Sequence, residues 1–164
     1  MHESEHEFVE SHEEMEAFLE ENELGHLGLV DGDRPYVVPL NYSYHDGGRI
    51  LFHCALEGKK RDLIRENPNV SFTVCRQYEA VRPHGSDACH LDSDSVMCFG
   101  TARIIDDLEE RSTMLNEFNH FFRPTADDVP AEEVAHCGVV EITVHEMTGR
   151  RERERERTLW KWTF

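Results

Sequence analysis

Two short glycine-containing turns divide residues 24–54 into segments of alternating apolar and polar side chains, and this pattern limits the possible folds most strongly. The first turn contains Asp31-Gly32 and the second contains Asp46-Gly47-Gly48. Such turns between alternating segments are typical of β-hairpins, because glycine adopts the positive φ angles that tight turns require. Strands joined by so short a turn pair antiparallel. The sequence therefore predicts consecutive antiparallel hairpins, which precede any further helix.

Later segments add strands to these hairpins. Residues 69–76, 95–105 and 138–147 concentrate or alternate apolar side chains over the length of a strand. Residues 77–94 lack a clear pattern and are expected to form an irregular strand and a loop. Six strands with helices between them predict a mainly β protein, a small six-stranded β-barrel with peripheral α-helices.

Three helices are expected beside the strands. Ser11 and Glu14 form a capping-box pattern before a short apolar stripe, and Gly25 is the expected end of this first helix. A second helix begins near Lys59 and stops before Pro68, because the residue before a proline disfavours helical backbone. A third helix, between the last two strands, places four apolar side chains on one side: Leu108, Leu115, Phe118 and Phe122.

The length of 164 residues and the apolar content of 38% suit a single domain with one core. Within it, residues 1–23 are expected to form an acidic N-terminal helix, and residues 151–164 form a tail that begins with alternating Arg and Glu. The acidic N-terminus lacks the basic and apolar regions of a signal peptide, so a cytoplasmic protein is expected. Five cysteines without a C-x-x-C pair disfavour a disulfide framework and a zinc site, and no metal is predicted.

The net charge of −17 disfavours nucleic acids and anionic membranes as partners. Against this background, residues 59–82 contain six basic residues and three acids, and residues 150–161 contain the same numbers. A positive pocket in a negative protein suits a small anion with several charges. The alternative is that both basic segments are solvated surfaces.

The segment around Pro39 is the first candidate binding element. Val38 and Leu40 face one way in the expected strand, and Pro39 and Asn41 face the other. Proline lacks the N–H that a central strand needs, so Pro39 predicts an edge strand or a bulge. Backbone groups left free there would suit a flat heterocycle such as the pyrimidine side of a flavin ring. The alternative is an ordinary edge that faces water.

The second candidate element follows the strand that ends near His53-Cys54. There Gly58 leads into a helix that opens with Lys59 and Lys60. Glycine lets the backbone approach an anion, and the unpaired N–H groups at a helix start attract negative charge. The segment therefore predicts a phosphate site, with an ordinary surface helix as the alternative. Its spacing is not that of a Walker loop, so nucleotide hydrolysis is disfavoured.

Together these segments resemble the FMN-binding split-barrel family related to pyridoxamine 5′-phosphate oxidase, in the branch that contains nitroimidazole-resistance reductases. The similarity covers residues 12–151 and is most specific in the runs PYVVPLN and FHCALEGKK. The later runs DSVMCFGTARIIDDLEER and ITVHEMTGRR match in order and character. The resemblance implies a Greek-key-like split barrel and a homodimer with two flavins at the subunit interface.

The resemblance also implies a role for each matching position. One strand would lie along the flavin ring, largely through its backbone: Val38, Pro39, Leu40 and Asn41. His53 and Cys54 would border the ring and the ribityl chain. The phosphate would be held by Gly58, Lys59 and Lys60. Ser95 would contact the flavin from the neighbouring subunit, and Arg150 would lie near the site.

Two departures from the family pattern qualify this reading. The alternation of Arg and Glu in residues 151–157 and the terminal run LWKWTF fall outside it, and Trp160 and Trp162 are expected to pack rather than to stack on a ligand. Asn41 lies near the position where a pyridoxamine phosphate oxidase carries a lysine. This second departure counts against oxidation of vitamin B6 compounds.

Bound FMN, or FAD in its place, would supply the redox chemistry, and the protein would orient it. The first hypothesis is an oxidoreductase that passes a hydride by a ping-pong scheme from an NAD(P)H-type donor to a nitroimidazole-like acceptor. His53 is the candidate proton donor or acceptor, and the alternative is a wall residue without a chemical role. A non-enzymatic flavin-binding protein or electron carrier is the main rival. A haem-binding split barrel is less favoured, because the phosphate-holding residues would then have no purpose.

Overall fold

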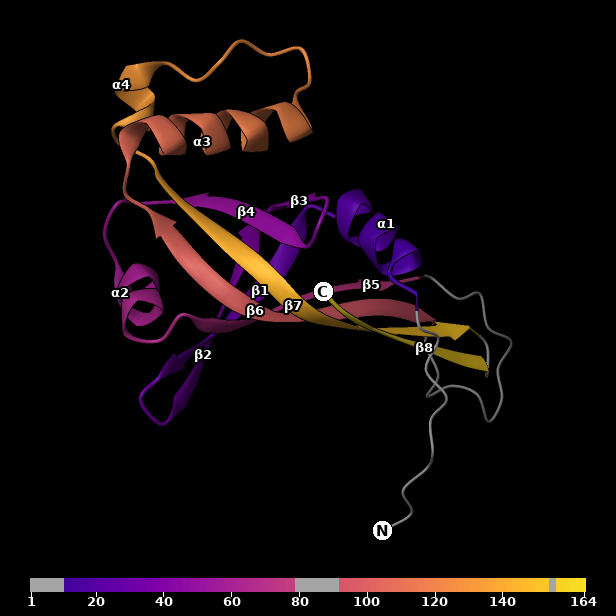
Figure 1. Cartoon of the computed structure of the whole chain (residues 1–164). Helices are drawn as coiled ribbons and strands as arrows, with labels where there is room; N and C mark the ends of the chain where they lie inside the picture. The colour runs from indigo at the N-terminus through magenta and orange to yellow at the C-terminus, as the bar shows by residue number, and fades with distance from the viewer. Residues whose placement is uncertain (1–10, 79–91, 154–155) are drawn as a thin grey trace.

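The computed structural model describes residues 11–78, 92–153 and 156–164 (Figure 1). Its strands are β1 (Leu24–Asp31), β2 (Arg34–Asn41), β3 (Ser43–His45), β4 (Arg49–Cys54), β5 (Asn69–Gln77), β6 (Ser93–Ile105), β7 (Gly138–Arg153) and β8 (Glu156–Thr163). Its helices are α1 (Glu13–Glu21), α2 (Lys59–Glu66), α3 (Leu108–Phe122) and α4 (Ala131–Val134). The prediction of a mainly β protein with peripheral helices is confirmed. None of the helices described is long and apolar enough to cross a membrane.

The strands form one antiparallel sheet in the order β2-β1-β5-β6-β7-β4-β3, and β8 pairs with the second half of β7. The strands at the two ends of this order, β2 and β3, are consecutive in the chain. The sheet is therefore joined end to end through one connecting residue, and no hydrogen-bonded strand pair among the described residues closes it. This is a split-barrel arrangement with eight strands, where the sequence predicts six.

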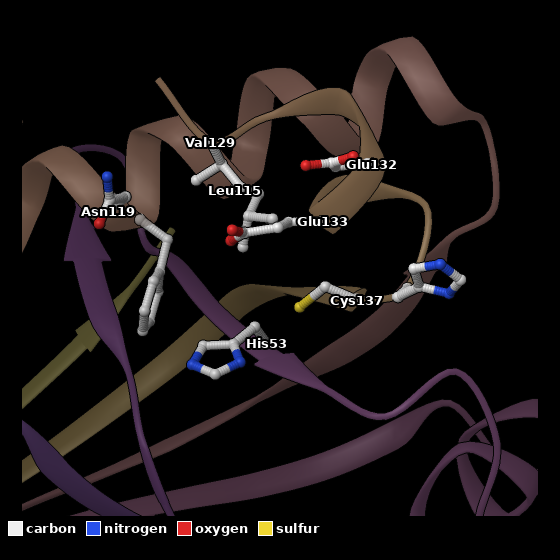
Figure 2. A pocket seen from close by; sticks show the side chains of 9 residues that line it. His53, Leu115, Asn119, Val129, Glu132, Glu133 and Cys137 are labelled. Carbon is white, nitrogen blue, oxygen red and sulfur yellow. The ribbon is translucent and has the colours of Figure 1, made fainter. Parts of the chain in front are cut away.

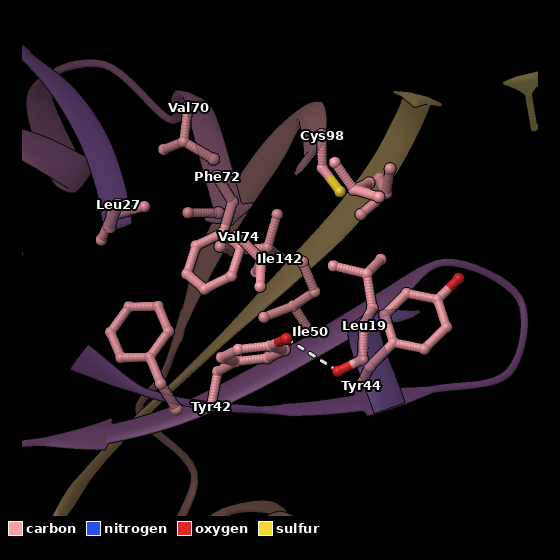
Figure 3. Close-up of a cluster of buried hydrophobic side chains, with 14 of the residues drawn as sticks. Leu19, Leu27, Tyr42, Tyr44, Ile50, Val70, Phe72, Val74, Cys98 and Ile142 are labelled. Carbon is pink, nitrogen blue, oxygen red and sulfur yellow. Dashed lines mark hydrogen bonds between the residues drawn. The ribbon is translucent and has the colours of Figure 1, made fainter. Parts of the chain in front are cut away.

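Tyr42 divides β2 from β3, although the sequence pattern predicts one continuous strand. The Tyr42 side chain is fully buried, and its ring meets Phe72 edge-to-face with 4.8 Å between centroids. Its hydroxyl donates a hydrogen bond of 2.7 Å to the Leu19 carbonyl in α1 (Figure 3). Its backbone N–H donates to the Glu23 carbonyl between α1 and β1. These contacts take Tyr42 out of the strand ladder and direct the chain from one end of the sheet to the other.

The main core lies on one face of the sheet. Leu27, Phe72, Cys98 and Met147 are successive partners across β1, β5, β6 and β7, and all four are almost fully buried. A second, smaller cluster lies between the sheet and the helices α3 and α4 and includes Leu51, Ile105, Leu115, Phe118, Val134 and Val139. The strand β4 contributes to both clusters, so successive residues of β4 face different parts of the molecule.

The helix α1 does not begin with the predicted capping box. His12 precedes the helix without a side-chain cap, and the Ser11 hydroxyl bonds to the Glu13 carboxylate rather than to a backbone N–H. The prediction that Gly25 ends this helix is also wrong, because Gly25 lies in β1. A Cβ at Gly25 would come within 2.2 Å of the Phe72 ring, so close packing explains this glycine.

The helix α2 begins at Lys59 and ends before Pro68, as predicted. In α3 the Asp107 carboxylate caps the helix by accepting a hydrogen bond of 2.8 Å from the Glu110 backbone N–H. Leu115 and Phe118 are buried as expected, but Leu108, the first residue of α3, is 51% exposed. Leu108 is thus the exposed member of the predicted apolar side. The short helix α4 has no counterpart in the sequence-based prediction.

The tail rich in Arg and Glu continues the sheet. Residues 151–153 extend β7, and most of the remaining tail forms β8. Trp160 lies opposite Gly149, is 5% exposed and carries the Arg151 guanidinium 5.0 Å from its ring centroid. Trp160 is thus part of the main core, which confirms the expectation that it packs.

Candidate functional site

The segment that follows β4 borders a cavity of about 240 Å³ near β2, here called the α2 cavity. Its lining includes Tyr36 and Val38 of β2, Cys54 at the end of β4, and the four residues Gly58, Lys59, Lys60 and Arg61. The three residues predicted to hold a phosphate therefore share one cavity with two of the predicted flavin contacts, Val38 and Cys54.

The backbone at the start of α2 is arranged to accept an anion. Gly58 has a φ of 130°, in the region that favours glycine, and nothing lies within 4 Å of the position that a Cβ would take. Its carbonyl accepts hydrogen bonds from the backbone N–H of Arg61 at 2.9 Å and of Asp62 at 3.2 Å. The N–H groups of Lys59 and Lys60 precede these bonds and belong to the unpaired first turn of the helix. Negative charge is favoured at this position.

The two lysines differ in the contacts that they already make. The Lys59 ammonium pairs with the Asp31 carboxylate and lies 5.4 Å from the centroid of the Tyr36 ring. The Lys60 ammonium lies 5.4 Å from the centroid of the buried Phe52 ring, and no carboxylate of the described residues pairs with it. Lys60 is therefore the more available positive charge at the α2 cavity.

Arg61 is a further residue of this cavity that the sequence pattern does not single out. Its side chain is 3% exposed, and its Nη2 lies 3.3 Å from Asp106 Oδ1. Its Nε and Nη1 are buried without a hydrogen-bond partner among the described residues. Gly138 makes room for this side chain, because a Cβ there would stand 2.5 Å from Nη1. A buried guanidinium with unmet donors costs free energy, which an anion in the cavity would recover.

The strand β2 is an edge strand, as Pro39 predicts. Val38 and Leu40 are half-buried and pack against the main core, whereas Pro39 and Asn41 are exposed. The Asn41 amide donates a hydrogen bond of 2.9 Å to the Glu23 carbonyl. Only β1 pairs with β2 within the described sheet, so the other edge of β2 offers backbone groups to a ligand.

His53 and Cys54 lie on opposite sides of β4. Cys54 lines the α2 cavity, whereas His53 lines a second cavity of about 560 Å³ between β4, α3 and α4, here called the α3–α4 cavity (Figure 2). The His53 ring meets the Phe118 ring edge-to-face, with 5.0 Å between centroids. Burial lowers the pKa of His53 below its usual value, and the positive charge of Lys60 adds to this effect. Because His53 faces the α3–α4 cavity, its side chain does not line the α2 cavity.

Ser95 and Arg150 are direct partners across β6 and β7. The pairings across β1 and β5 put Met97 of β6 at the same height in the sheet as Pro39 of β2. Tyr36, which lines the α2 cavity, lies on one side of this height, and Ser95 lies on the other side. Within one chain Ser95 and Arg150 therefore do not line the α2 cavity.

The fold and the α2 cavity define a split-barrel protein with a basic cavity at a helix start. A family model described as pyridoxamine 5′-phosphate oxidase matches residues 11–151, which is most of the chain. This protein belongs to that family. A curated relative, an uncharacterized protein of Rhizobium meliloti (strain 1021), is 35% identical over 78 residues, which span 44% of this chain and 50% of the relative. The chain thus spans about half the length of that relative.

Solved structures share the fold over nearly the whole chain. A candidate 5-nitroimidazole antibiotic resistance protein from Bacteroides thetaiotaomicron is 25% identical, with a TM-score of 0.75, over 91% of this chain and 95% of that one. A flavocytochrome from Azotobacter vinelandii is 19% identical, with a TM-score of 0.77, over 95% of this chain and 79% of that one. An FAD-binding protein from Mesorhizobium loti is 24% identical, with a TM-score of 0.65, over 87% of this chain and 96% of that one. The last two similarities concern the fold alone.

Proposed function

We propose that this protein is an FMN-dependent oxidoreductase that holds the FMN phosphate in the α2 cavity. The observation that carries this proposal is the buried Arg61 guanidinium, whose Nε and Nη1 have no partner among the described residues. A phosphate oxygen can accept a hydrogen bond from one of these donors, and charge-assisted bonds of this kind are strong. The Lys60 ammonium and the unpaired first turn of α2 add further donors at the same place. The residues present therefore fit a flavin phosphate.

The charge at the α2 cavity favours FMN over FAD. FMN ends in a phosphate monoester with up to two negative charges, whereas the corresponding phosphate of FAD is part of a diester-like linkage with one. Three basic side chains line the cavity, and one of them, Lys59, is already paired with Asp31. Among the described residues, Arg61 is paired only through Nη2, with the exposed Asp106 carboxylate, and Glu57 is the one acid in the lining. Lys60 and the buried side of Arg61 therefore favour the more highly charged monoester.

The rest of the flavin is proposed to extend toward β2 and the end of β4. Val38 and Cys54 line the same cavity as the basic residues, so they are the first positions along this path. Pro39, Leu40 and Asn41 follow along the open edge of β2. Backbone N–H and C=O groups on this edge can pair with the alternating donors and acceptors of the flavin pyrimidine.

The bound flavin would supply hydride transfer. The protein from Bacteroides thetaiotaomicron, described as a candidate nitroimidazole resistance protein, supports nitroimidazoles and other small nitroaromatics as acceptors. We therefore propose a ping-pong reaction with an NAD(P)H-type donor. His53 is proposed to be a wall residue rather than the proton-transfer group, because its side chain lines the α3–α4 cavity, on the other side of β4 from the α2 cavity.

We also propose a homodimer with the flavin at its interface. Val37 and Phe99 belong to one row across β2, β1, β5 and β6 on the outward face of the sheet, and they are 60% and 42% exposed. Met97 lies on the same face and is 40% exposed. Exposed apolar side chains grouped in this way are typical of an interface. Ser95 shares this face, so a second chain docked there could place its own Ser95 and Arg150 near the flavin.

Spectroscopy of the purified full-length protein tests the proposal. The protein, loaded with FMN and desalted, should retain a flavin band near ~450 nm, release FMN on denaturation and lose the band when NADH or NADPH is added without oxygen. A nitroimidazole such as metronidazole should then restore the band. Reduction without reoxidation by the nitroimidazole would contradict the acceptor and favour an electron carrier. Protein that stays colourless with excess FMN, or that shows a haem Soret band, would overturn the proposed cofactor.

A further inference from the structure

The α3–α4 cavity has the dimensions and lining of a small-molecule site of its own. Its volume of about 560 Å³ falls within the usual range for ligand pockets, roughly 300–1,000 Å³. Leu115, Phe118 and Val129 form the apolar part of the lining, here called the apolar wall. In Figure 2 Leu115 and Val129 lie across the open space from His53, whereas the Phe118 ring contacts the His53 ring edge-to-face. The strand β4 separates this cavity from the α2 cavity, because His53 and Cys54 point to opposite sides.

The charge of the α3–α4 cavity is opposite to that of the α2 cavity. Glu132 and Glu133 of α4 line it, and its lining contains no lysine or arginine. Neither carboxylate forms an ion pair with another described residue. In Figure 2 the Glu133 carboxylate and the Cys137 thiol reach into the space above the His53 ring. The lowered pKa of His53 leaves its imidazole neutral, so it does not offset this negative charge.

We propose that the α3–α4 cavity binds a small, planar aromatic cation. The apolar wall would cover the faces of a flat ring, and the Phe118 ring can also attract a cation through its π system. Glu132 and Glu133 would pair with the positive group, whereas an anion would be repelled by both. This site is separate from the proposed flavin site and requires no redox step, so it goes beyond the proposed function.

Three isosteric probes test this inference: benzamidine, which is a cation, benzamide, which is neutral, and benzoate, which is an anion. Each is titrated into the full-length protein, with and without FMN, while NMR follows the His53 ring. Benzamidine should shift the His53 resonances and bind about tenfold or more tightly than benzamide, with weaker binding at higher salt. Benzoate should not saturate. Equal affinities for the three probes, or no shift at His53, would overturn the proposal.

Matched variants separate the local carboxylates from the general negative charge of the protein. The double substitution Glu132→Gln and Glu133→Gln should reduce the benzamidine affinity about tenfold, toward that of benzamide. A control pair, Glu20→Gln and Glu109→Gln, removes the same charge from exposed positions outside the cavity and should leave the affinity unchanged. An equal loss in both pairs, or no loss in the first, would contradict the proposed role of Glu132 and Glu133.

A third variant tests the place of binding without any change of charge. Val129→Trp would fill part of the cavity from its apolar wall, and it should weaken benzamidine and benzamide by the same factor. Unchanged binding of both probes would place them elsewhere and overturn the proposal. Arg61→Met, which alters only the α2 cavity, should leave benzamidine binding intact, so this result does not depend on whether FMN binds.

Discussion

Replacing Arg61 by methionine should stabilise the protein when FMN is absent. The guanidinium is buried, and each unmet buried donor costs about 1–3 kcal/mol, a cost that applies to both Nε and Nη1. The Asp106 carboxylate, 3.3 Å from Nη2, is 74% exposed, and an ion pair with so exposed a partner contributes about 0–1 kcal/mol. Methionine keeps an apolar stem of similar length and brings no donor. The two unmet donors cost about 2–6 kcal/mol and the lost ion pair contributes about 0–1 kcal/mol, so the free energy of unfolding should rise by about 1–6 kcal/mol.

Urea and thermal unfolding of the FMN-free protein measure this change. For a domain of this size, each 1 kcal/mol raises Tm by about 2–4 °C, so a rise of at least about 2 °C is expected. Arg65→Met is the matched control, because Arg65 lies in the same helix but its side chain is 51% exposed, and its effect should stay within about 0.5 kcal/mol. Added FMN should raise the stability of the wild type by more than it raises the stability of the Arg61→Met variant. If Arg61→Met instead lowers the stability of the FMN-free protein, the guanidinium is a structural group and the reasoning is refuted.

Three further substitutions address other contacts. His53→Ala should retain FMN and nitroimidazole turnover, because its side chain lies across β4 from the α2 cavity. A loss of turnover of about 100-fold in steady-state kinetics would show instead that His53 transfers a proton at the flavin. Gly138→Ala would place a Cβ 2.5 Å from the Arg61 guanidinium, so the affinity for FMN should fall about tenfold in a fluorescence titration. An unchanged affinity would contradict this packing. Burial opposes ionisation of Glu141, but hydrogen bonds from Arg103 and Arg49 outweigh it and hold the Glu141 pKa below 4.5. The stability that this ionised carboxylate contributes is present above its unfolded-state pKa and is lost as pH falls through its folded-state pKa. Glu141→Gln should therefore flatten the decline of the urea midpoint below about pH 4.5, and an unaltered decline would rule out this contribution.

Several features of the site are predictable from the sequence because they depend on local chemistry. Pro39 predicts an edge strand, since a missing N–H cannot serve a central strand, and β2 is at the edge. Gly58 followed by two lysines predicts a helix start, and α2 begins at Lys59 with Gly58 at a positive φ. In both cases the residue type restricts its own backbone conformation, independently of the tertiary structure around it.

Other features depend on distant parts of the chain. Tyr42 interrupts its strand because the Leu19 and Glu23 carbonyls and the Phe72 ring are brought to it by the fold. The period of a strand predicts that His53 and Cys54 face opposite sides. However, the α3–α4 cavity that His53 lines exists only because later helices pack there.

The buried state of Arg61 is a second feature that local sequence does not reveal. In the sequence Arg61 is one more cation after Lys59 and Lys60, and a surface position would be its ordinary place. Its burial depends on Asp106, which directly follows β6, and on the absence of a side chain at Gly138 in β7. Both partners are remote in sequence, so only the folded chain identifies this guanidinium as a phosphate-binding candidate.

The relative affinity for FMN and riboflavin tests the central claim most directly, because riboflavin lacks only the phosphate. Fluorescence titration should give an FMN affinity at least about 100-fold higher than that of riboflavin, as expected for two or more charge-assisted hydrogen bonds. Arg61→Met and Lys60→Met should each reduce the affinity for FMN and leave that for riboflavin unchanged. Equal affinities for the two flavins in the wild type would show that the α2 cavity does not hold the phosphate.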